Sequence, residues 1–434
     1  MAETGTTTRE REKTTALADL IEYAYREVAH FHSMIDKLGY TPADFQTAAD
    51  LRKIPFMTKD MIQQNISDFV AKEYQRYPKS QKIEVKRTSG STGKYLKIYW
   101  DRHDDIRSLF PLWKMRYRLY GIEPQNHFCT FYTANYKGNK IVEAERELLG
   151  SNGRTLGFSK VGLTHERLLE IYEKILEFNP DWFYLQPSVA VLLADLVSEE
   201  KLAVPSNLRY IETTGELLTK DCRERISSVF RAPLADMYGT NETNGIAFEC
   251  PEHHHHVLTG NAIVEIIKDG KPVIGEEGDV FVTCLNNFAM PFIRYETGDR
   301  GTLIPSDCPC GNKEPIFIPA TGRSTDLVLL HDGQRVSSYV LAGIIEYTNE
   351  YMEGVIKQYQ FRQLDIDEFD VTIALKPAYV GWSEAVRDCF LENVKEPLLK
   401  DAKWHFHFVE TIYPDEQTGK HKHFYPLKRD FTRK

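Results

Sequence analysis

The spacing of hydrophobic residues along the first half of the chain predicts helices that alternate with short strands. Residues 14–36 carry apolar side chains at intervals of three or four positions, which predicts an N-terminal helix. Leu163–Phe178 repeats this spacing and predicts a second helix. The apolar run Trp182–Leu185 predicts a short buried strand, and Ser188 is a candidate N-cap for a helix over Val189–Val197. Helices that alternate with strands indicate an α/β body.

Farther along the chain, alternation between apolar and polar positions becomes the stronger signal. Ile263–Leu285 contains two alternating strands around Lys268-Asp269-Gly270-Lys271, a sequence typical of a hairpin turn. Beyond Gly322 the pattern changes, and we expect a domain boundary there. The chain would then have a large α/β domain over residues 1–321 and a small α+β domain over residues 322–434. The elements expected in the small domain are strands over Val355–Leu364 and Phe369–Leu375 and a helix near Ala385–Leu399.

Residues 404–408 alternate aromatic side chains with two histidines, His405 and His407. Successive side chains of a strand point to opposite faces of a sheet. We therefore expect these two histidines on the solvent face of a strand, without a catalytic role.

Composition and charge narrow the choice of partners and location. The 434 residues are 42% hydrophobic and 27% charged, as in an ordinary globular protein. The formal net charge of −9 gives no electrostatic reason to expect a nucleic acid or an anionic membrane as a partner. No apolar run approaches the length of a spanning helix, and the polar N-terminus lacks the apolar core of a signal peptide. We expect a cytoplasmic protein.

A loop rich in glycine and hydroxyl side chains precedes an alternating strand at residues 87–99. Glycines let the backbone approach an anion, and hydroxyls with a lysine can surround a polyphosphate. The loop is not of the Walker type, which has four residues between its glycines and a Ser or Thr after the lysine. Taken alone, it could equally be a solvated turn. The candidate phosphate-binding residues are Thr88, Ser89, Gly90, Ser91, Thr92, Gly93 and Lys94.

Cysteines and histidines in one region supply the ligands that zinc prefers. Cys250 is followed by the run His253–His256 and later by Cys308-Pro309-Cys310. A Cys3His set is a common closed structural zinc site, although the spacing here is not that of a standard zinc finger. The alternative is free thiols and a solvated histidine run. His256 is the favoured histidine because two apolar strand residues follow it, so the predicted zinc ligands are Cys250, His256, Cys308 and Cys310.

Five short motifs occur in one order along residues 88–420. They are Thr88–Lys94, Tyr238-Gly239-Thr240-Asn241-Glu242, Tyr295-Glu296-Thr297-Gly298-Asp299, Gly322-Arg323-Ser324-Thr325-Asp326 and Thr418-Gly419-Lys420. With these motifs the chain resembles the adenylate-forming superfamily of acyl-CoA synthetases and, within it, the phenylacetate–CoA ligase family. Leu51–Lys59 also resembles the phenylacetate ligase branch, whose members often have similar Cys, His and Cys-x-Cys elements. The resemblance covers nearly the whole chain.

The resemblance implies a large multi-sheet N-terminal adenylation domain and a small mobile C-terminal domain that carries the catalytic lysine. Lys420 would bridge the carboxylate and the α-phosphate of ATP in the transition state, with Lys422 as the alternative. Glu242 would associate with Mg²⁺, because a hard cation prefers oxygen ligands. Thr325 and Asp326 would form the hinge between the domains.

The resemblance also implies a binding site for the nucleotide. Asp299 would accept hydrogen bonds from both ribose hydroxyls, Tyr238 would lie against the adenine ring, and Asp236 would accept from the adenine amino group. Gly215-Glu216 would flank the adenine. The implied nucleotide-binding residues outside the phosphate loop are Gly215, Glu216, Asp236, Tyr238, Gly239, Thr240, Asn241, Asp299 and Arg323.

The acid pocket is implied at Phe131, Tyr132 and Tyr136, with Pro187-Ser188 nearby. Aromatic walls suit an aryl acid, and the alternative is that these residues simply form core.

The chain departs from the family pattern at three places. Asn241 replaces the usual Thr or Ser, Thr325 replaces the hinge aspartate, and the stretch 330–336 is one residue longer than in the family. The last two departures lie in the part of the small domain that helps to form the CoA-accepting state in relatives, so they leave the second half-reaction less certain than the first.

The sequence predicts an ATP-dependent ligase that converts a carboxylic acid, phenylacetate or a related aryl acid, into acyl-AMP and then an acyl-CoA. Its cofactors would be ATP, Mg²⁺, CoA and a structural Zn²⁺. One alternative is an adenylating enzyme that passes the acyl group to an amine or a carrier-protein thiol. Another is a non-catalytic nucleotide- or zinc-binding protein on the same fold. The oligomeric state stays open, with a homodimer among the options.

Overall fold

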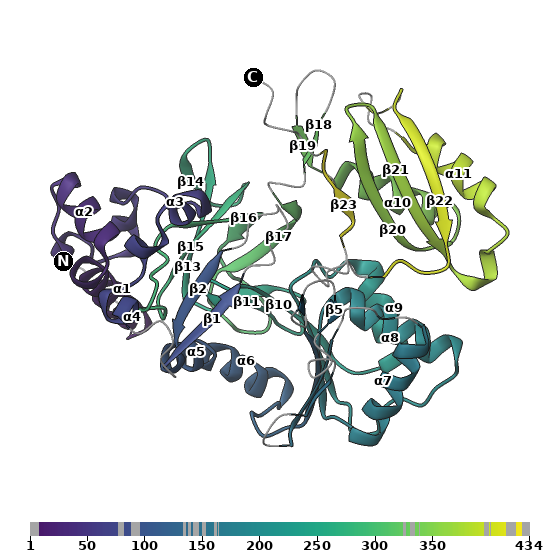
Figure 1. Ribbon diagram of the computed structural model, residues 1–434, viewed down its shortest axis with the longest axis horizontal. Coiled ribbons are helices and arrows are strands. Elements are labelled where there is room, and N and C mark those ends of the chain that lie inside the picture. Colours follow the sequence, from purple (N-terminus) through teal and green to yellow (C-terminus); the bar gives the residue numbers. More distant parts are fainter. Residues whose placement is uncertain are drawn as a thin grey trace.

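The computed structural model is an α/β protein with one large sheet and a smaller C-terminal sheet (Figure 1). This confirms the expected fold class. Among the described residues, no helix is both long and apolar enough to cross a membrane. The structure describes residues 8–76, 82–87, 96–132, 136–137, 140–141, 147–149, 153–159, 163, 165–323, 327–329, 335–337, 339–394, 399, 401–413 and 422–427.

Parallel strands form one half of the large sheet, which has thirteen strands in the described part of the chain. β7, β3, β8, β9 and β10 lie side by side in that order and run in the same direction. Helices α7, α8 and α9 cover one face of these strands, and α6 packs on the other (Figure 1). The bounds are β3 Phe128–Tyr132, β7 Thr155–Ser159, β8 Trp182–Leu185, β9 Tyr210–Thr214, β10 Leu234–Thr240, α6 Phe110–Tyr120, α7 His165–Phe178, α8 Pro187–Glu199 and α9 Lys220–Phe230.

Antiparallel strands continue the sheet beyond β10, in the order β11, β12, β17, β16, β15, β13 and β14. The N-terminal helices share a buried core with these strands and with β2. The bounds are α1 Thr8–Glu27, α2 Ala29–Leu38, α3 Lys59–Gln64, α4 Lys72–Arg76, β1 Ile83–Arg87, β2 Lys97–Asp101, α5 Arg102–Ser108, β11 Asn244–Glu249, β12 His255–Val257, β13 Ala262–Lys268, β14 Lys271–Val273, β15 Glu277–Cys284, β16 Tyr295–Ile304 and β17 Ile316–Arg323. At the other edge, β6 Glu147–Leu149 pairs with β7, while β4 Tyr136–Lys137 and β5 Lys140–Ile141 pair with each other.

The C-terminal sheet has the strand order β22, β21, β20 and β23, and α10 and α11 share its buried apolar core. Because this core is separate from those of the large sheet, the C-terminal part forms its own packed unit. The boundary at residue 322 stays a prediction. The bounds are β18 Leu327–Leu329, β19 Arg335–Ser337, α10 Tyr339–Tyr351, β20 Ile356–Asp365, β21 Glu368–Leu375, α11 Ser383–Glu392, β22 Lys403–Val409 and β23 Phe424–Tyr425.

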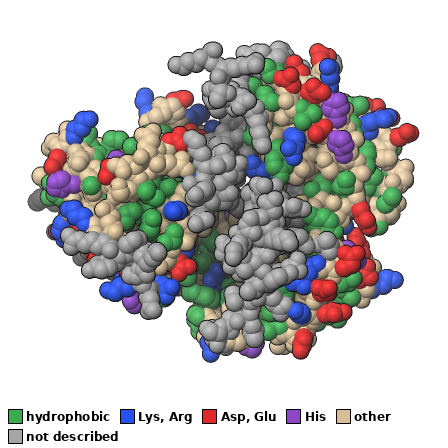
Figure 2. All heavy atoms as spheres, in the orientation of Figure 1, with side chains coloured by type: hydrophobic (Ala, Val, Ile, Leu, Met, Phe, Trp, Pro, Cys, Tyr) green, Lys and Arg blue, Asp and Glu red, His purple; other side chains and the backbone are tan. Residues whose placement is uncertain are grey.

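Most elements expected from the hydrophobic pattern are present. α7, β8, β20 and β21 match their predicted ranges closely, and the strands around residues 268–271 form a hairpin. β22 presents His405 and His407 to solvent, where they contact Glu368 and Asp370. Figure 2 shows histidine and acidic side chains close together on this side of the molecule.

Three local expectations were wrong. The N-terminal helix is broken at Val28, whose backbone is extended. The sequence did not show this break, because Phe31 continues the apolar stripe into the same core. Gln186, not Ser188, is the N-cap of α8, since Pro187 has the backbone angle that suits the first helical residue. α11 ends at Glu392, well short of Leu399.

Candidate active site

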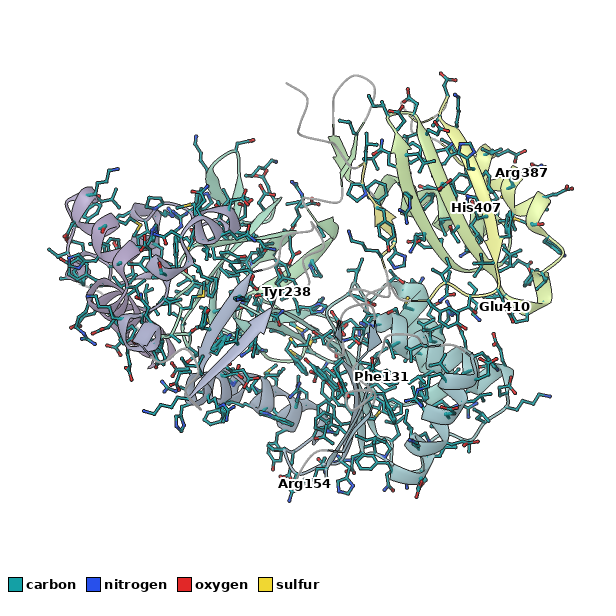
Figure 3. All side chains as sticks on the ribbon, viewed as in Figure 1. Phe131, Arg154, Tyr238, Arg387, His407 and Glu410 are labelled. Atoms are coloured by element: carbon teal, nitrogen blue, oxygen red, sulfur yellow. The ribbon has the colours of Figure 1, made fainter. Side chains whose placement is uncertain are left out.

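Several of the described residues that are expected to bind the nucleotide or the acid lie on β3, β9 and β10 or directly after them. The carboxyl ends of β3, β8, β9 and β10 lie together because these strands are parallel neighbours. Ligands of open α/β sheets bind outside this edge. Figure 3 shows Phe131 among the parallel strands and Tyr238 near the middle of the molecule.

Tyr238 on β10 and Asp299 on β16 are hydrogen-bonded to each other near this edge. The Tyr238 hydroxyl donates to Asp299 Oδ2 at 2.8 Å, and the Tyr238 ring packs on Phe317 with 4.6 Å between centroids. Asp299 on β16 pairs with Arg323 on β17, so two separate motifs stand opposite each other in the sheet. The hydrogen bond orients the Asp299 carboxylate and leaves it capacity to accept further hydrogen bonds.

Glu242 is buried, and the hydroxyl of Tyr295 donates to its Oε1 at 2.9 Å. Burial raises the pKa of Glu242, because removal from water disfavours the charged carboxylate. A bound cation would favour the charged form, and a carboxylate oxygen is a suitable ligand for Mg²⁺. The neighbouring Asn241 carbonyl accepts from the Trp100 indole at 2.9 Å, which ties this turn to β2.

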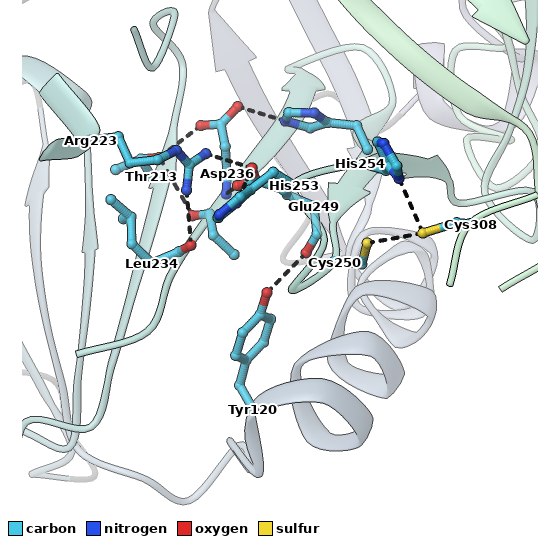
Figure 4. A network of polar contacts seen from close by, with 12 residues as sticks. Tyr120, Thr213, Arg223, Leu234, Asp236, Glu249, Cys250, His253, His254 and Cys308 are labelled. Carbon is cyan, nitrogen blue, oxygen red and sulfur yellow. Dashed lines mark hydrogen bonds and ion pairs between the residues drawn. The ribbon is translucent and has the colours of Figure 1, made fainter. Parts of the chain in front are cut away.

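Asp236 on β10 is held by three hydrogen bonds (Figure 4). Its Oδ1 accepts from the Thr213 hydroxyl at 2.7 Å, and its Oδ2 lies 3.0 Å from His255 Nε2. Its backbone N–H donates to Glu249 Oε2 at 2.7 Å. Glu249 is itself fully buried and accepts from Arg223 at 2.5 Å. The carboxylate of Asp236 is therefore fixed in the sheet.

The segment Gly215-Glu216 follows β9 and packs against the start of α8. Gly215 has φ +80°, a left-handed backbone that favours glycine. Glu216 Oε2 accepts from the backbone N–H of Ser188 at 3.0 Å. The Ser188 hydroxyl and the Gln186 side-chain oxygen are buried and have no hydrogen-bond partner among the residues that the structure describes. Both atoms lie at the edge where the acid pocket is expected, and either could bind a polar group of a ligand.

The aromatic residues of the expected acid pocket are only partly described. Phe131 is buried and packs on Phe158, with 5.6 Å between ring centroids. Tyr132 ends β3 and is half-buried. The side chain of Tyr136 lies outside the described part of the chain. The acid pocket at these three residues therefore stays a prediction.

The four predicted zinc ligands lie together. The ligand atoms of Cys250, His256, Cys308 and Cys310 are all within 4.8 Å of one another. Cys250 Sγ is 3.7 Å from Cys308 Sγ, and Cys310 Sγ is 3.3 Å from His256 Nε2. His256 Nδ1 contacts the Glu314 carbonyl at 3.0 Å, which turns Nε2 toward the thiols.

The chemistry of these four donors fits zinc. Burial lowers the pKa of His256 and so favours the neutral imidazole that binds metals. Burial also raises the pKa of the Cys250 thiol to about 12, and a metal ion would oppose this effect by stabilising the thiolate. Cys250, Cys308 and Cys310 are free cysteines. The sequence did not indicate that His254 Nδ1 would also contact Cys308 Sγ, at 3.1 Å.

Several predicted site residues lie outside the described part of the chain. They are Thr88–Lys94, Thr325, Asp326 and Lys420, together with the side chain of Arg323. Lys422 is described, and its ammonium lies 5.3 Å from the centre of the Tyr425 ring.

Sequence patterns alone missed two groups of charged residues beside the site. Arg116 forms a bidentate ion pair with Glu212, at 2.7 and 2.5 Å, and both side chains are buried. Glu249 and His255, which contact Asp236, were also missed. The alternation along β12 could have indicated that His255 and His256 face opposite sides of the sheet.

The fold is that of acyl-CoA ligases. The structure of 2-hydroxyisobutyryl-CoA ligase in its postadenylation state aligns with a TM-score of 0.73 at 16% identity, covering 98% of this chain and 94% of that one. The same ligase in its thioesterification state aligns with a TM-score of 0.60, at 18% identity over 98% of this chain and 91% of that one.

Among curated proteins, the chain is similar to phenylacetate-coenzyme A ligases. The protein from Thermus thermophilus is 24% identical over 390 residues, covering 85% of this chain and 83% of the relative. That from Escherichia coli is 25% identical over 369 residues, covering 82% and 80%. No family model matches the chain. These similarities confirm the resemblance that the five motifs indicated.

Proposed function

We propose that this protein is an AMP-forming acid–thiol ligase. It joins a carboxylic acid to ATP, giving acyl-AMP and pyrophosphate, and then transfers the acyl group to the CoA thiol, releasing AMP. The observation that carries the proposal is the convergence of Asp236, Tyr238, Asp299 and Gly215-Glu216 at the carboxyl edge of one sheet. The named ligases to which the chain is similar support the same chemistry.

In the first step the acid attacks the α-phosphorus, and the P–O bond to pyrophosphate breaks. Both reactants are anionic, so positioning and electrostatic stabilisation do most of the catalytic work. Asp299 would hold the ribose and Asp236 the adenine amino group, which fixes the nucleotide at two separate points. Glu242 would help to hold Mg²⁺, which screens the phosphate charge when bound.

Lys420 is proposed as the catalytic lysine, because its ammonium can stabilise charge between the carboxylate and the α-phosphate. A rotation of the C-terminal domain about Thr325 and Asp326 would then remove this lysine and admit CoA. We place the domain boundary near residue 322, and the separate core of the C-terminal sheet supports it.

The proposed substrate is phenylacetate or a related aryl acid. The names of the similar ligases and the aromatic residues Phe131 and Tyr132 support this class. The two buried oxygens at Gln186 and Ser188 could accept hydrogen bonds from a ligand, so the proposed acid class includes acids that carry a hydroxyl or an amine.

The zinc centre is proposed as structural. It would join the adjacent strands β11 and β12 to the loop before β17, which is more than 50 residues farther along the chain. All four donors come from protein side chains, as in closed structural sites, and none is among the residues proposed to touch the nucleotide.

Acid-dependent pyrophosphate exchange across aryl, aliphatic and amino acids tests the function. We expect exchange with ATP only when an accepted acid is present, and highest with an aryl acid. A second measurement adds CoA, an amine or a carrier-protein thiol and identifies the acylated product. Pyrophosphate exchange in the absence of any acid would contradict adenylation of an acid. So would a lack of exchange with every acid in the panel. Exchange followed by transfer only to an amine or a carrier protein would replace CoA as the acceptor, an outcome that the longer stretch 330–336 motivates.

A further inference from the structure

A row of polar residues crosses four neighbouring strands, β9 to β12, next to the expected nucleotide edge. Glu249 on β11 pairs with His255 on β12, and Asp236 on β10 lies beside Glu249 and pairs with Thr213 on β9. None of the five motifs contains Thr213, Glu249 or His255. The row therefore joins the Tyr238 segment to strands that have no direct part in the proposed chemistry.

The geometry points to Glu249 and His255 as positioning residues that fix Asp236 for recognition of the purine base. This inference rests on the proposed function, in which Asp236 accepts from the adenine amino group. An ionised carboxylate only accepts hydrogen bonds, so His255 Nε2–H donates to Oδ2 while the Thr213 hydroxyl donates to Oδ1. Each oxygen keeps a further accepting site for a ligand amino group.

Burial makes this orientation effective. Asp236 is 7% exposed, and the His255 side chain is 12% exposed. Hydrogen bonds to a charged group in such surroundings are among the stronger ones in proteins. Glu249 adds a second restraint, because it accepts the backbone N–H of Asp236 and is held in turn by Arg223.

The Cys/His cluster lies on the opposite face of β12 from Asp236 and contacts both β12 and the end of β11. His255 and His256 are consecutive in β12 and point to opposite faces of the sheet, one toward Asp236 and the other toward the thiols. Cys250 directly follows Glu249 in the chain, and its backbone N–H donates to the His254 carbonyl at 2.9 Å. The row is therefore anchored at a rigid junction of β11 and β12.

The test compares ATP with inosine triphosphate, in which a carbonyl replaces the adenine amino group. His255→Leu should raise the KM for ATP about tenfold and leave kcat nearly unchanged, since the lost hydrogen bond to a charged group fixes the base and not the reacting atoms. The KM for inosine triphosphate should change much less, so the preference for ATP falls. His255→Gln should restore most of the preference, because the Gln amide can donate from a similar position.

Asp236→Asn and the double variant complete the cycle. If His255 acts through Asp236, the effect of His255→Leu should nearly vanish when Asp236 is already Asn, because residues that act as a unit are not additive. His405→Leu is the matched control: His405 pairs with Glu368 at 2.7 Å in the exposed C-terminal sheet and should leave the preference intact. Zinc content should be equal in all variants.

Each outcome has a separate meaning. An unchanged preference in His255→Leu, with a lowered one in Asp236→Asn, would overturn the role of His255 alone. An unchanged preference in Asp236→Asn would overturn the contact between Asp236 and the base. Absence of acid-dependent exchange in the unmodified protein would instead overturn the proposed function itself.

Discussion

At the residue scale, two tyrosine–carboxylate hydrogen bonds organise the candidate active site. Tyr238 donates to Asp299 and Tyr295 donates to Glu242, at 2.8 and 2.9 Å. Each pair joins residues that are more than 50 positions apart in the chain. The bonds fix two carboxylates, Asp299 on β16 and Glu242 between β10 and β11, where one is proposed to meet the ribose and the other Mg²⁺.

Asp299→Ala should weaken ATP binding by at least about tenfold, because a hydrogen bond to a charged group contributes about 1.5–3 kcal/mol. Calorimetric titration with ATP measures the change. Asp299→Asn is the matched variant, since it keeps the size and an acceptor for the Tyr238 hydroxyl while losing the charge. Unmodified affinity in Asp299→Ala would contradict the ribose assignment.

Lys420→Ala should lower the single-turnover rate of acyl-AMP formation by about a hundredfold or more, as for other groups that stabilise transition-state charge. Its affinity for ATP should change little, because the ammonium is needed mainly in the transition state. Lys422→Ala is the control, since that ammonium lies over the Tyr425 ring. The reverse pattern would make Lys422 the catalytic residue.

At the scale of elements, β11 and β12 connect the proposed zinc centre to the nucleotide edge. Two proposed zinc ligands, Cys250 and His256, directly follow residues that contact Asp236. Those residues are Glu249 and His255. A bound zinc ion would therefore add a cross-link between these strands and the loop before β17, beside the pairing of β12 with β17 and the small apolar cluster around Ile316.

Cys308→Ser should reduce zinc content from about one ion per chain and lower the melting temperature, since closing such a site contributes to folding stability. Elemental analysis and thermal unfolding of protein purified without metal-affinity resin measure both. Cys389→Ser is the matched control, because Cys389 is a free cysteine in α11 of the C-terminal unit. Metal-free unmodified protein with the same melting temperature as Cys308→Ser would favour the reading as free thiols.

At the scale of the whole molecule, charged residues join the C-terminal sheet to helices α8 and α9, which pack on the large sheet. Lys357 at the start of β20 is 2.9 Å from Glu199 and 3.5 Å from Asp195, both on α8. Arg225 on α9 contacts Asp195 at 2.5 Å and donates to the Lys357 carbonyl. The Lys357 side chain is only 6% exposed, so these contacts are more than loose surface pairs.

Lys357→Met should make the C-terminal unit separate more readily from helices α8 and α9. Loss of the ammonium removes its ion pairs with Glu199 and Asp195, and Arg225 keeps its contact with Asp195, so the contact between the units weakens. Small-angle scattering should report a changed distribution of distances, and acyl-AMP formation should slow more than transfer to CoA. Lys403→Met, at the exposed start of β22, is the control. Unchanged scattering and an unchanged ratio of the two rates would show that this cluster does not hold the units together.

The sequence by itself determined the class of fold, most elements and the positions of the motifs. Local spacing is sufficient for this, because the alternation over residues 404–408 or the helical stripe of α7 records which face of one element is buried. Residue type and the apolar residues that follow His256 also picked out the four Cys and His residues that the structure brings together, and their role as zinc ligands stays a prediction.

Only the tertiary structure decided which polar groups meet. The contact of His255 with Asp236, the pair Arg116–Glu212 and the cluster around Lys357 each join residues on different elements. Such contacts depend on strand order and on how helices dock, and a one-dimensional pattern carries neither. The break at Val28 and the cap at Gln186 were missed for a related reason: packing against a shared core and the geometry of Pro187 outweighed the local preference that the sequence suggested.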